Sequence, residues 1–122
     1  MNVRTFQDLQ VWQRGHELVL GTYRITRKFP DTEKFGLVTQ LRRSAVSVCA
    51  NIAEGGKKSR KDFHRFLEIA DGSLEETKYH LILAKDLRYI SENEFELLFE
   101  KANTVGRMLN GLKNSLNLTL NS

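Results

Sequence analysis

Residues 33–56 carry two stripes at helical spacing, one apolar and one polar. The apolar positions recur at steps of three and four, as a core-facing helix requires, and are Val38, Leu41, Ala45, Val48 and Ile52. The polar stripe repeats with the same steps about 110° further round the helix and holds Gln40, Ser44, Ser47, Asn51 and Glu54. Small residues there let another backbone come close, and the long polar ones need hydrogen-bond partners if they are covered. The pattern predicts a helix that packs on two sides.

Three further helices are predicted over residues 8–28, 60–89 and 92–116. The apolar face of the first is Leu9, Trp12, His16, Val19, Tyr23 and Thr26, that of the third is Phe63, Phe66, Ala70, Leu74, Thr77, Leu81 and Ala84, and that of the fourth is Phe95, Leu98, Ala102, Val105, Leu109, Leu112 and Leu116. We expect Asp8 to cap the first helix and Ser59 and Ser91 to begin capping boxes. Gly72 interrupts the third helix at a cost of about 1 kcal/mol relative to alanine, which we attribute to a closely packed neighbouring helix.

These elements predict an all-α fold, an antiparallel up-down-up-down four-helix bundle. The 122 residues suit a single domain spanning 1–122, with a frayed tail at 117–122. Short connections, around Pro30, Gly55-Gly56 and Ser91, force neighbouring helices to run in opposite directions.

Several apolar residues do not fit inside one bundle. They lie off the seams of the last two helices and are Ile69, Ile82, Leu83, Leu97, Phe99 and Met108. Together with the polar stripe they indicate a second packing surface, which we interpret as self-association into a homo-oligomer.

Catalytic and cofactor chemistry finds little support in the sequence. The three histidines do not have the spacing of metal ligands. The run Gly55-Gly56-Lys57-Lys58-Ser59 lacks the first glycine and the preceding strand of a phosphate-binding loop. The single cysteine, Cys49, lies beside the apolar stripe and is expected to be a buried thiol. Folding the second and third predicted helices back on each other places Arg43 level with Gly72 and Ser47 level with Glu68, so an Arg-Glu network explains the acidic residues better than catalysis does. We predict no enzyme, no metal and no cofactor.

A run of basic residues surrounds the turn between the second and third predicted helices. It comprises Lys57, Lys58, Arg60, Lys61 and Arg65. Two of these, Arg60 and Lys61, occupy the first turn of a helix, where unpaired backbone N–H groups already favour anions over cations. Basic side chains at such a place suit a phosphate group, and the net charge of +4 agrees with an anionic partner. The alternative is a solvated charge run that aids solubility. Arg42 and Arg43 are weaker candidates for the same role.

Membrane insertion is not expected. No apolar run approaches the ~20 residues of a membrane span, and the first residues lack the hydrophobic centre of a signal peptide. These features predict a cytoplasmic protein with no membrane partner.

Long stretches of the chain resemble a known bacterial family. The Phe29-Pro30 corner, Gln40 to Ser47, the run Asn51-Ile52-Ala53-Glu54-Gly55 and the segment Phe63 to Glu75 are similar to the four-helix-bundle proteins encoded in intervening sequences of 23S ribosomal RNA genes. The opening Phe6-Gln7-Asp8-Leu9-Gln10-Val11-Trp12 is also similar, and the resemblance covers about residues 6 to 112.

The resemblance implies a ring-like homopentamer and an association with ribosomal RNA. A similar fold serves as the nucleic-acid-binding accessory subunit of reverse transcriptases in diversity-generating retroelements. The family signature implies structural roles for Gln40, Ser47, Asn51, Glu54, Gly55, Gly72 and Ser73. Two hypotheses follow: an oligomeric bundle that binds RNA or DNA backbone with little base readout, or a scaffold or adaptor whose partner is a protein, such as a reverse transcriptase.

Overall fold

The chain is all-helical. The computed structural model describes residues 5–120, with side chains through Leu116, and this part contains no strand. Its four α-helices are α1 (Gln10–Thr26), α2 (Leu37–Gly55), α3 (Arg60–Asp86) and α4 (Glu92–Leu120), joined by two short 3-10 helices, η1 (Phe6–Asp8) and η2 (Asp31–Glu33). The predicted all-α class and the existence of four helices are confirmed.

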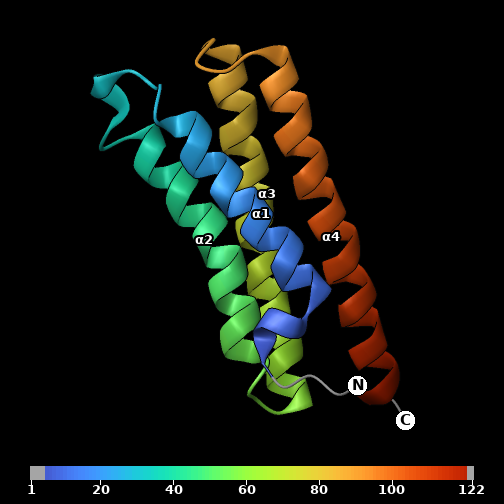
Figure 1. Cartoon of the computed structure of the whole chain (residues 1–122). Coiled ribbons are helices and arrows are strands. Elements are labelled where there is room, and N and C mark those ends of the chain that lie inside the picture. Colours follow the sequence, from blue (N-terminus) through green and yellow to red (C-terminus); the bar gives the residue numbers. More distant parts are fainter. Residues whose placement is uncertain (1–4, 121–122) are drawn as a thin grey trace.

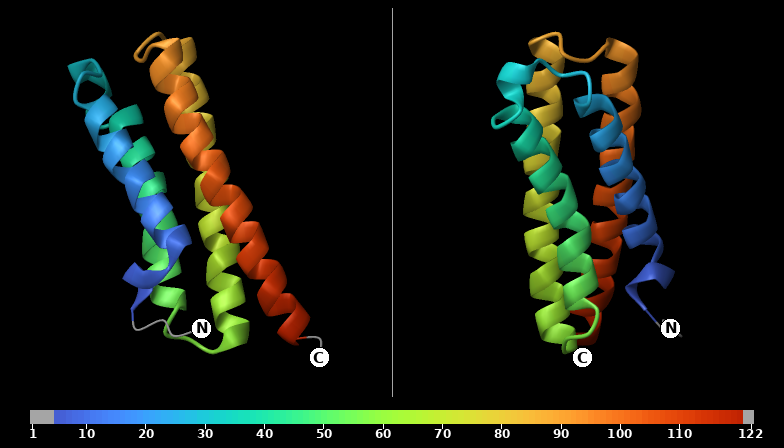
Figure 2. Two further views of the ribbon diagram at one scale, coloured as in Figure 1. Left: turned by 45° about the vertical axis from the view of Figure 1, so that its right-hand side comes forward. Right: turned by 60° about the vertical axis from the view of Figure 1, so that its left-hand side comes forward.

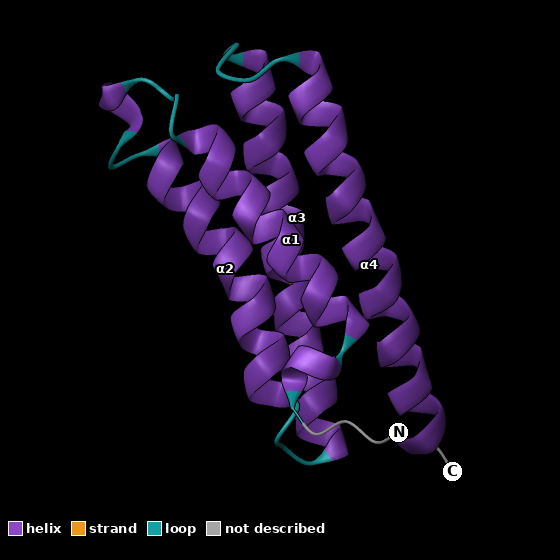
Figure 3. Ribbon diagram, in the orientation of Figure 1, coloured by secondary structure: helices purple, strands orange, loops and turns teal. Residues whose placement is uncertain are grey.

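The connections alternate between the two ends of the helices. Figure 1 shows the α1–α2 and α3–α4 connections at one end, and the α2–α3 connection at the other end beside the start of α1 and the last turn of α4. The two rotated views in Figure 2 show the same arrangement, and Figure 3 shows the connecting loops at these ends and a further short loop between η1 and α1. The helices in contact are α1 with α2, α2 with α3, α3 with α4 and α4 with α1, so that each packs on two others.

The core runs along the inner faces of all four helices. Its largest fully buried aliphatic side chains are Leu18, Leu41, Val48, Ile52, Leu67, Leu74, Leu81, Val105 and Leu109. Removing one side chain of this size from water contributes about 1.5–3 kcal/mol to the stability of the folded state. The faces predicted for α2 and α3, and most of the face predicted for α4, are buried or half-buried, because their three-four spacing matches the helical repeat.

The face predicted for α1 is confirmed in part. Leu9, Val19 and Thr26 are buried, whereas His16 and Tyr23 are exposed. The other buried residues of this helix and its end are Val11, Gly15, Leu18, Gly21, Thr22, Ile25 and Phe29. Small residues let α1 approach its neighbours: a Cβ added at Gly21 would lie 2.5 Å from Leu98 Cδ2. The aromatic residues of α1 stand at the edge of the core because the centre of the contact has no room for them.

Hydrogen bonds at the starts of α1 and α2 explain why these two helices begin at other residues than predicted. Thr5 caps η1, and Asp8 accepts a hydrogen bond from the Thr5 backbone N–H, so the expected cap of α1 by Asp8 is wrong. The second helix begins at Leu37, four residues later than expected, because residues 31–33 form η2 and the Glu33 side chain accepts from the Leu37 N–H. The caps predicted at Ser59 and Ser91 are both present.

The ends of the last two helices also differ from the prediction. The third helix ends at Asp86, and Arg88 adopts a left-handed backbone with φ 64°. The Tyr89 N–H then bonds to the Ala84 carbonyl, which closes the helix in a Schellman motif. The fourth helix continues to Leu120, so residues 117–120 of the predicted tail are helical, and residues 121–122 lie outside the described residues.

The explanation offered for Gly72 is wrong. This residue is exposed, and a Cβ added there would meet nothing within 4 Å. Close approach occurs instead at Gly55, where an added Cβ would lie 2.6 Å from Phe66 Cβ. There is therefore no space for a side chain at Gly55, whereas there is space for one at Gly72.

Candidate nucleic-acid interface

Five basic residues gather where α2 ends and α3 begins. We call Lys57, Lys58, Arg60, Lys61 and Arg65 the basic turn, and all five are exposed. Backbone hydrogen bonds from Gly56 to Ile52 and from Lys58 to Gly55 close the end of α2. The Ser59 hydroxyl then accepts from the Asp62 N–H at 3.2 Å and starts α3. This tight reversal places all five cations at one tip of the molecule, the end where α2 turns into α3 in Figure 1.

The charges of the basic turn are not balanced within the described part of the chain. None of the five cations forms an ion pair among residues 5–116, and residues 56–65 contain one acidic residue, Asp62. Arg65 lies over the ring of Phe66, at 4.9 Å from its centroid. Because the first backbone N–H groups of α3 also carry partial positive charge, the tip attracts anions through both side chains and backbone.

Arg42 and Arg43 lie apart from the basic turn. They stand 13 and 12 residues before the end of α2, which is about 20 Å along the helix. The Arg42 guanidinium donates from Nε to Thr26 Oγ1 at 2.8 Å and lies 4.4 Å from the centre of the Tyr23 ring. Arg43 is exposed. The seven candidate contacts thus fall into two separate regions.

Neutral polar groups join α2 to α3 between these regions. We call Ser44, Ser47, Ser73 and Thr77, with His80, the hydroxyl network. Ser47 Oγ lies 2.8 Å from Ser73 Oγ, and Thr77 Oγ1 donates to Ser44 Oγ at 2.9 Å. Ser44 Oγ also lies 3.3 Å from His80 Nδ1. Every one of these side chains has a partner inside the protein, which indicates a structural role.

The expected pairing of α2 with α3 is shifted. Ser47 faces Ser73, five residues beyond the Glu68 that sequence alone placed level with it, because the chain reverses closer to Arg60 than to Lys57-Lys58. Glu68 is exposed and its carboxylate lies 3.5 Å from His64 Nδ1. The predicted Arg-Glu network between the helices is therefore replaced by neutral hydroxyl pairs.

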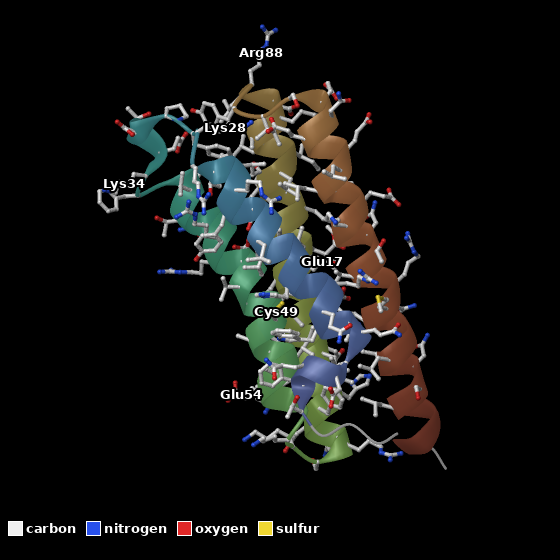
Figure 4. All side chains as sticks on the ribbon, viewed as in Figure 1. Glu17, Lys28, Lys34, Cys49, Glu54 and Arg88 are labelled. Atoms are coloured by element: carbon white, nitrogen blue, oxygen red, sulfur yellow. The ribbon has the colours of Figure 1, made fainter. Side chains whose placement is uncertain are left out.

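The other signature residues divide between the interface and the surface. Asn51 is half-buried and donates from Nδ2 to the Ser47 carbonyl at 2.8 Å. This hydrogen bond lies within α2. Gly55 packs directly against α3, as described above. Gln40 and Glu54 are exposed, and Glu54 is labelled on the outer side of α2 in Figure 4. The polar stripe is thus covered only in its middle.

Two buried groups have shifted pKa values. Burial lowers the pKa of His80, and the nearby carboxylate of Glu76 opposes this shift without reversing it. Burial raises the pKa of the Cys49 thiol to about 12. The thiol lies 3.8 Å from the Trp12 carbonyl. Cys49 is the buried thiol that the sequence predicted.

Some of the surplus apolar residues are exposed and others complete the core. Leu97 is 62 % exposed, and Ile69 and Ile82 are also on the surface. Leu83 and Met108 instead pack against the core cluster, so their assignment to a second packing surface is wrong. No helix of the described residues is both long and apolar enough to cross a membrane.

The chain is similar to solved structures and to one protein family. The crystal structure of a protein with unknown function from the S23 ribosomal protein family of Bacteroides thetaiotaomicron is similar, with 25% sequence identity and a TM-score of 0.78. The similarity covers 85% of this chain and 95% of that one. No curated protein is significantly similar to the chain.

The sequence model of the 23S rRNA-intervening sequence proteins matches residues 7–111, which include α1, α2, α3 and most of α4. This range contains the basic turn and the hydroxyl network. The chain therefore belongs to the 23S rRNA-intervening sequence protein family.

Proposed function

We propose that the protein is a non-enzymatic, cytoplasmic homo-oligomer, an antiparallel up-down-up-down bundle that binds the backbone of RNA through the basic turn. The observation that carries the proposal is the set of five exposed cations, without an ion pair among the described residues, at a helix N-terminus. The alternating connections in Figure 1 support the bundle topology. The name of the family supports ribosomal RNA as the ligand, and DNA backbone would offer the same phosphates.

Phosphate binding by this surface has a measurable signature. Each phosphate that a cation neutralises releases condensed counterions, and the logarithm of the binding constant falls by about 0.9 per contact for each decade of salt on duplex DNA, or about 0.7 on a single strand. Five contacts would give a slope of about −4 and weaken binding by about 10²–10³ between 50 and 200 mM salt. Because these contacts touch no base edges, little sequence preference is expected.

Self-association would multiply the surface. Exposed apolar side chains on α3 and α4, such as Ile69, Tyr79 and Leu97, support a second packing face. A pentamer would carry five basic turns, and a ligand that reaches several of them would bind far more tightly than one that reaches a single turn.

The same exposed apolar residues support a second candidate function. A protein scaffold or adaptor, such as an accessory subunit of a reverse transcriptase, would use them to bind another protein, and the basic turn would serve solubility. This candidate predicts no steep salt dependence.

A salt titration with two matched variants tests the proposal. One variant combines Lys57→Ala, Lys58→Ala, Arg60→Ala and Lys61→Ala, and the other removes four basic residues elsewhere, through Arg14→Ala, Arg88→Ala, Lys101→Ala and Arg107→Ala. Both lower the formal net charge from +4 to zero. Affinity for a ribosomal RNA fragment, random RNA and DNA is measured from ~50 to ~200 mM salt, with the assembled mass checked for each protein.

We expect the basic-turn variant to bind at least about 100-fold more weakly at low salt, and the control variant to stay within about five-fold of wild type. Equal losses in the two variants would indicate attraction by overall charge alone. Absence of binding by the wild type at low salt would rule out the nucleic-acid proposal and favour the scaffold.

A further inference from the structure

A second cationic surface lies at the opposite end of α2 from the basic turn. Arg27 follows α1, Lys34 and Phe35 lie between η2 and α2, and Arg42 is on the second turn of α2. We call these four residues the α1–α2 surface. Figure 4 labels Lys34 at this end and Glu54 near the other. None of the family signature residues belongs to this surface.

The cations of this surface line one hollow. It has a volume of about 170 Å³ and is bounded by Thr26, Arg27, Phe29, Pro30, Asp31, Lys34, Val38 and Arg42. Pockets that enclose a drug-sized ligand measure about 300–1,000 Å³, so this hollow is too small for a whole nucleoside. It suits a single compact anionic group such as a phosphate.

The electrostatics of the hollow favour an anion. Three cations and one carboxylate, that of Asp31, line it, and none of the four forms an ion pair among the residues with described side chains. The neighbouring Lys28 is different because it pairs with Glu94. The carboxylate of Glu33 is also engaged, since its oxygens accept from the Leu37 N–H and the Tyr89 hydroxyl.

Arg42 is oriented within this surface. Its Nε–H donates to Thr26 Oγ1, and its guanidinium stacks on Tyr23 at 4.4 Å. Two fixed contacts on one side of the guanidinium reduce the rotamer freedom that a ligand would otherwise have to remove. The two terminal nitrogens donate no hydrogen bond to the residues with described side chains and can bind two oxygens of a phosphate.

Phe35 is the most exposed large apolar side chain described. Its relative exposure is 87 %, and Lys34 Nζ lies 5.6 Å from its ring centroid. One face of the ring therefore has a cation near it, and the rest is open to water. An exposed aromatic ring beside cations is the combination by which proteins bind unpaired nucleotides, because any base can stack on the ring.

We propose that the α1–α2 surface binds an unpaired nucleotide of single-stranded nucleic acid, with a phosphate in the hollow and a base stacked on Phe35. This inference rests on the proposed function, to which it adds a preference for unpaired segments. The 19 residues of α2 are about 28 Å long, so one strand that reaches both ends of the helix spans at least that distance. The basic turn would hold backbone of any kind, and the α1–α2 surface would distinguish unpaired from paired regions.

The test compares a single strand with a duplex. Affinities are measured for 20-nucleotide single-stranded RNA and DNA carrying 2-aminopurine, whose fluorescence changes on stacking, and for duplexes of the same sequences. The variants are Phe35→Ala, Phe35→Tyr, the pair Arg27→Ala and Lys34→Ala, and the basic-turn variant. Leu20→Ala is the matched control, since Leu20 is another exposed apolar residue, on α1. The assembled mass of each protein is measured first.

We expect Phe35→Ala to weaken single-strand binding by about 5- to 150-fold and to abolish the 2-aminopurine signal, with duplex binding within about two-fold of wild type. Phe35→Tyr should retain both properties, because it keeps the ring. Loss of Arg27 and Lys34 should weaken single-strand binding by at least about five-fold. Leu20→Ala should leave the affinity for both the single strand and the duplex within about two-fold of wild type.

The opposite results separate this inference from the proposed function. If Phe35→Ala leaves single-strand binding intact while the basic-turn variant loses all binding, the present inference is wrong and the proposed function stands. If the basic-turn variant binds normally while Phe35→Ala and the Arg27→Ala, Lys34→Ala pair do not, the basic turn is excluded and the α1–α2 surface is supported. If Phe35→Ala changes the assembled mass, the residue belongs to an interface between copies and the inference is wrong. If the wild type binds no nucleic acid, both are wrong.

Discussion

The polar residues in the middle of α2 have partners inside the protein, and the cations at its two ends do not form ion pairs among the described residues. In the middle, Ser44 and Ser47 are neutral, at least half-buried and paired with Thr77 and Ser73 on α3. At the ends, the basic turn and the α1–α2 surface carry cations that have no ion-pair partner among the described residues. Polar residues with internal partners stabilise the fold, whereas charges without them are available to a ligand.

The residues between α2 and α3 also differ from the basic turn in what determines their identity. Family signature residues such as Ser47, Ser73 and Gly55 lie where α2 meets α3, so their identity follows from packing. The basic turn has no packing role that requires five cations. Substitutions of residues that pack between α2 and α3 should therefore change stability and leave ligand binding intact, and substitutions of the cations without an ion-pair partner should do the reverse.

The largest change in stability is expected for Gly55→Ala. The new Cβ would lie 2.6 Å from Phe66 Cβ, so α2 and α3 would have to move apart. We expect the free energy of unfolding to fall by about 1–3 kcal/mol, measured by urea denaturation. RNA affinity of the folded protein should change by less than about two-fold. A stability equal to wild type would show that the last turn of α2 is free to move.

The next largest effect is expected for Thr77→Val, which keeps the shape of the side chain and removes its hydroxyl. That hydroxyl lies 2.9 Å from Ser44 Oγ and 2.8 Å from the Ser73 carbonyl oxygen. We expect a loss of about 1–2 kcal/mol in the free energy of unfolding. The control is Thr104→Val, whose hydroxyl donates to the Glu100 carbonyl and accepts from the exposed Arg107, both within α4, and should matter less. Equal effects at the two positions would contradict a special role for the hydroxyl network.

A smaller effect of opposite sign is expected for Gly72→Ala. Nothing lies within 4 Å of the new Cβ, and alanine is the better helix former. The free energy of unfolding should rise by about 0.5–1 kcal/mol, again measured with urea. If stability rises but the assembled mass falls, this face of α3 contacts another copy.

The smallest effect is the pH dependence that His80 adds. Burial lowers its pKa in the folded state, so between the folded and ordinary pKa values the unfolded chain binds more protons. Its contribution to stability is therefore complete above the ordinary pKa of histidine, about 6.5, and decreases as the pH falls below it.

Urea denaturation at pH 7.5 and at pH 5 measures this contribution. His80→Gln should reduce the difference in stability between the two pH values, and His16→Gln, on the exposed side of α1, should preserve it. The lowered pKa of Glu94 does not interfere, because stability from that carboxylate is lost only at lower pH. An unchanged difference in His80→Gln would contradict the assignment.

Much of the fold was predictable from residue spacing. Leu41, Val48 and Ile52 on α2 are buried as expected, because three-four spacing reports the helical repeat directly. The caps at Ser59 and Ser91 follow from local hydrogen bonds that need no tertiary contact. The core-facing side of α1 was predicted only in part. Leu9 and Val19 are buried as expected, whereas Gly15 and Gly21 carry no hydrophobic signal and are buried through close helix contact.

The two cationic surfaces also differ in how far the sequence predicts them. The basic turn is continuous in sequence, so Lys57 to Arg65 could be identified as candidates before the structure was known. The α1–α2 surface brings Arg27 and Lys34 next to Arg42, which requires the reversal through η2 and depends on tertiary structure. The exposure of Phe35 also has no local signal in the sequence.

The hydroxyl network has a consequence for folding errors. Sliding α3 along α2 by one helical turn, about 5.4 Å, would carry Thr77 and Ser73 away from Ser44 and Ser47. Each buried hydroxyl left without a partner would cost about 1–3 kcal/mol, whereas leucines meeting different leucines would lose much less. A seam made only of apolar residues would accept several mis-registered pairings of these helices, and the hydroxyl pairs penalise all but one.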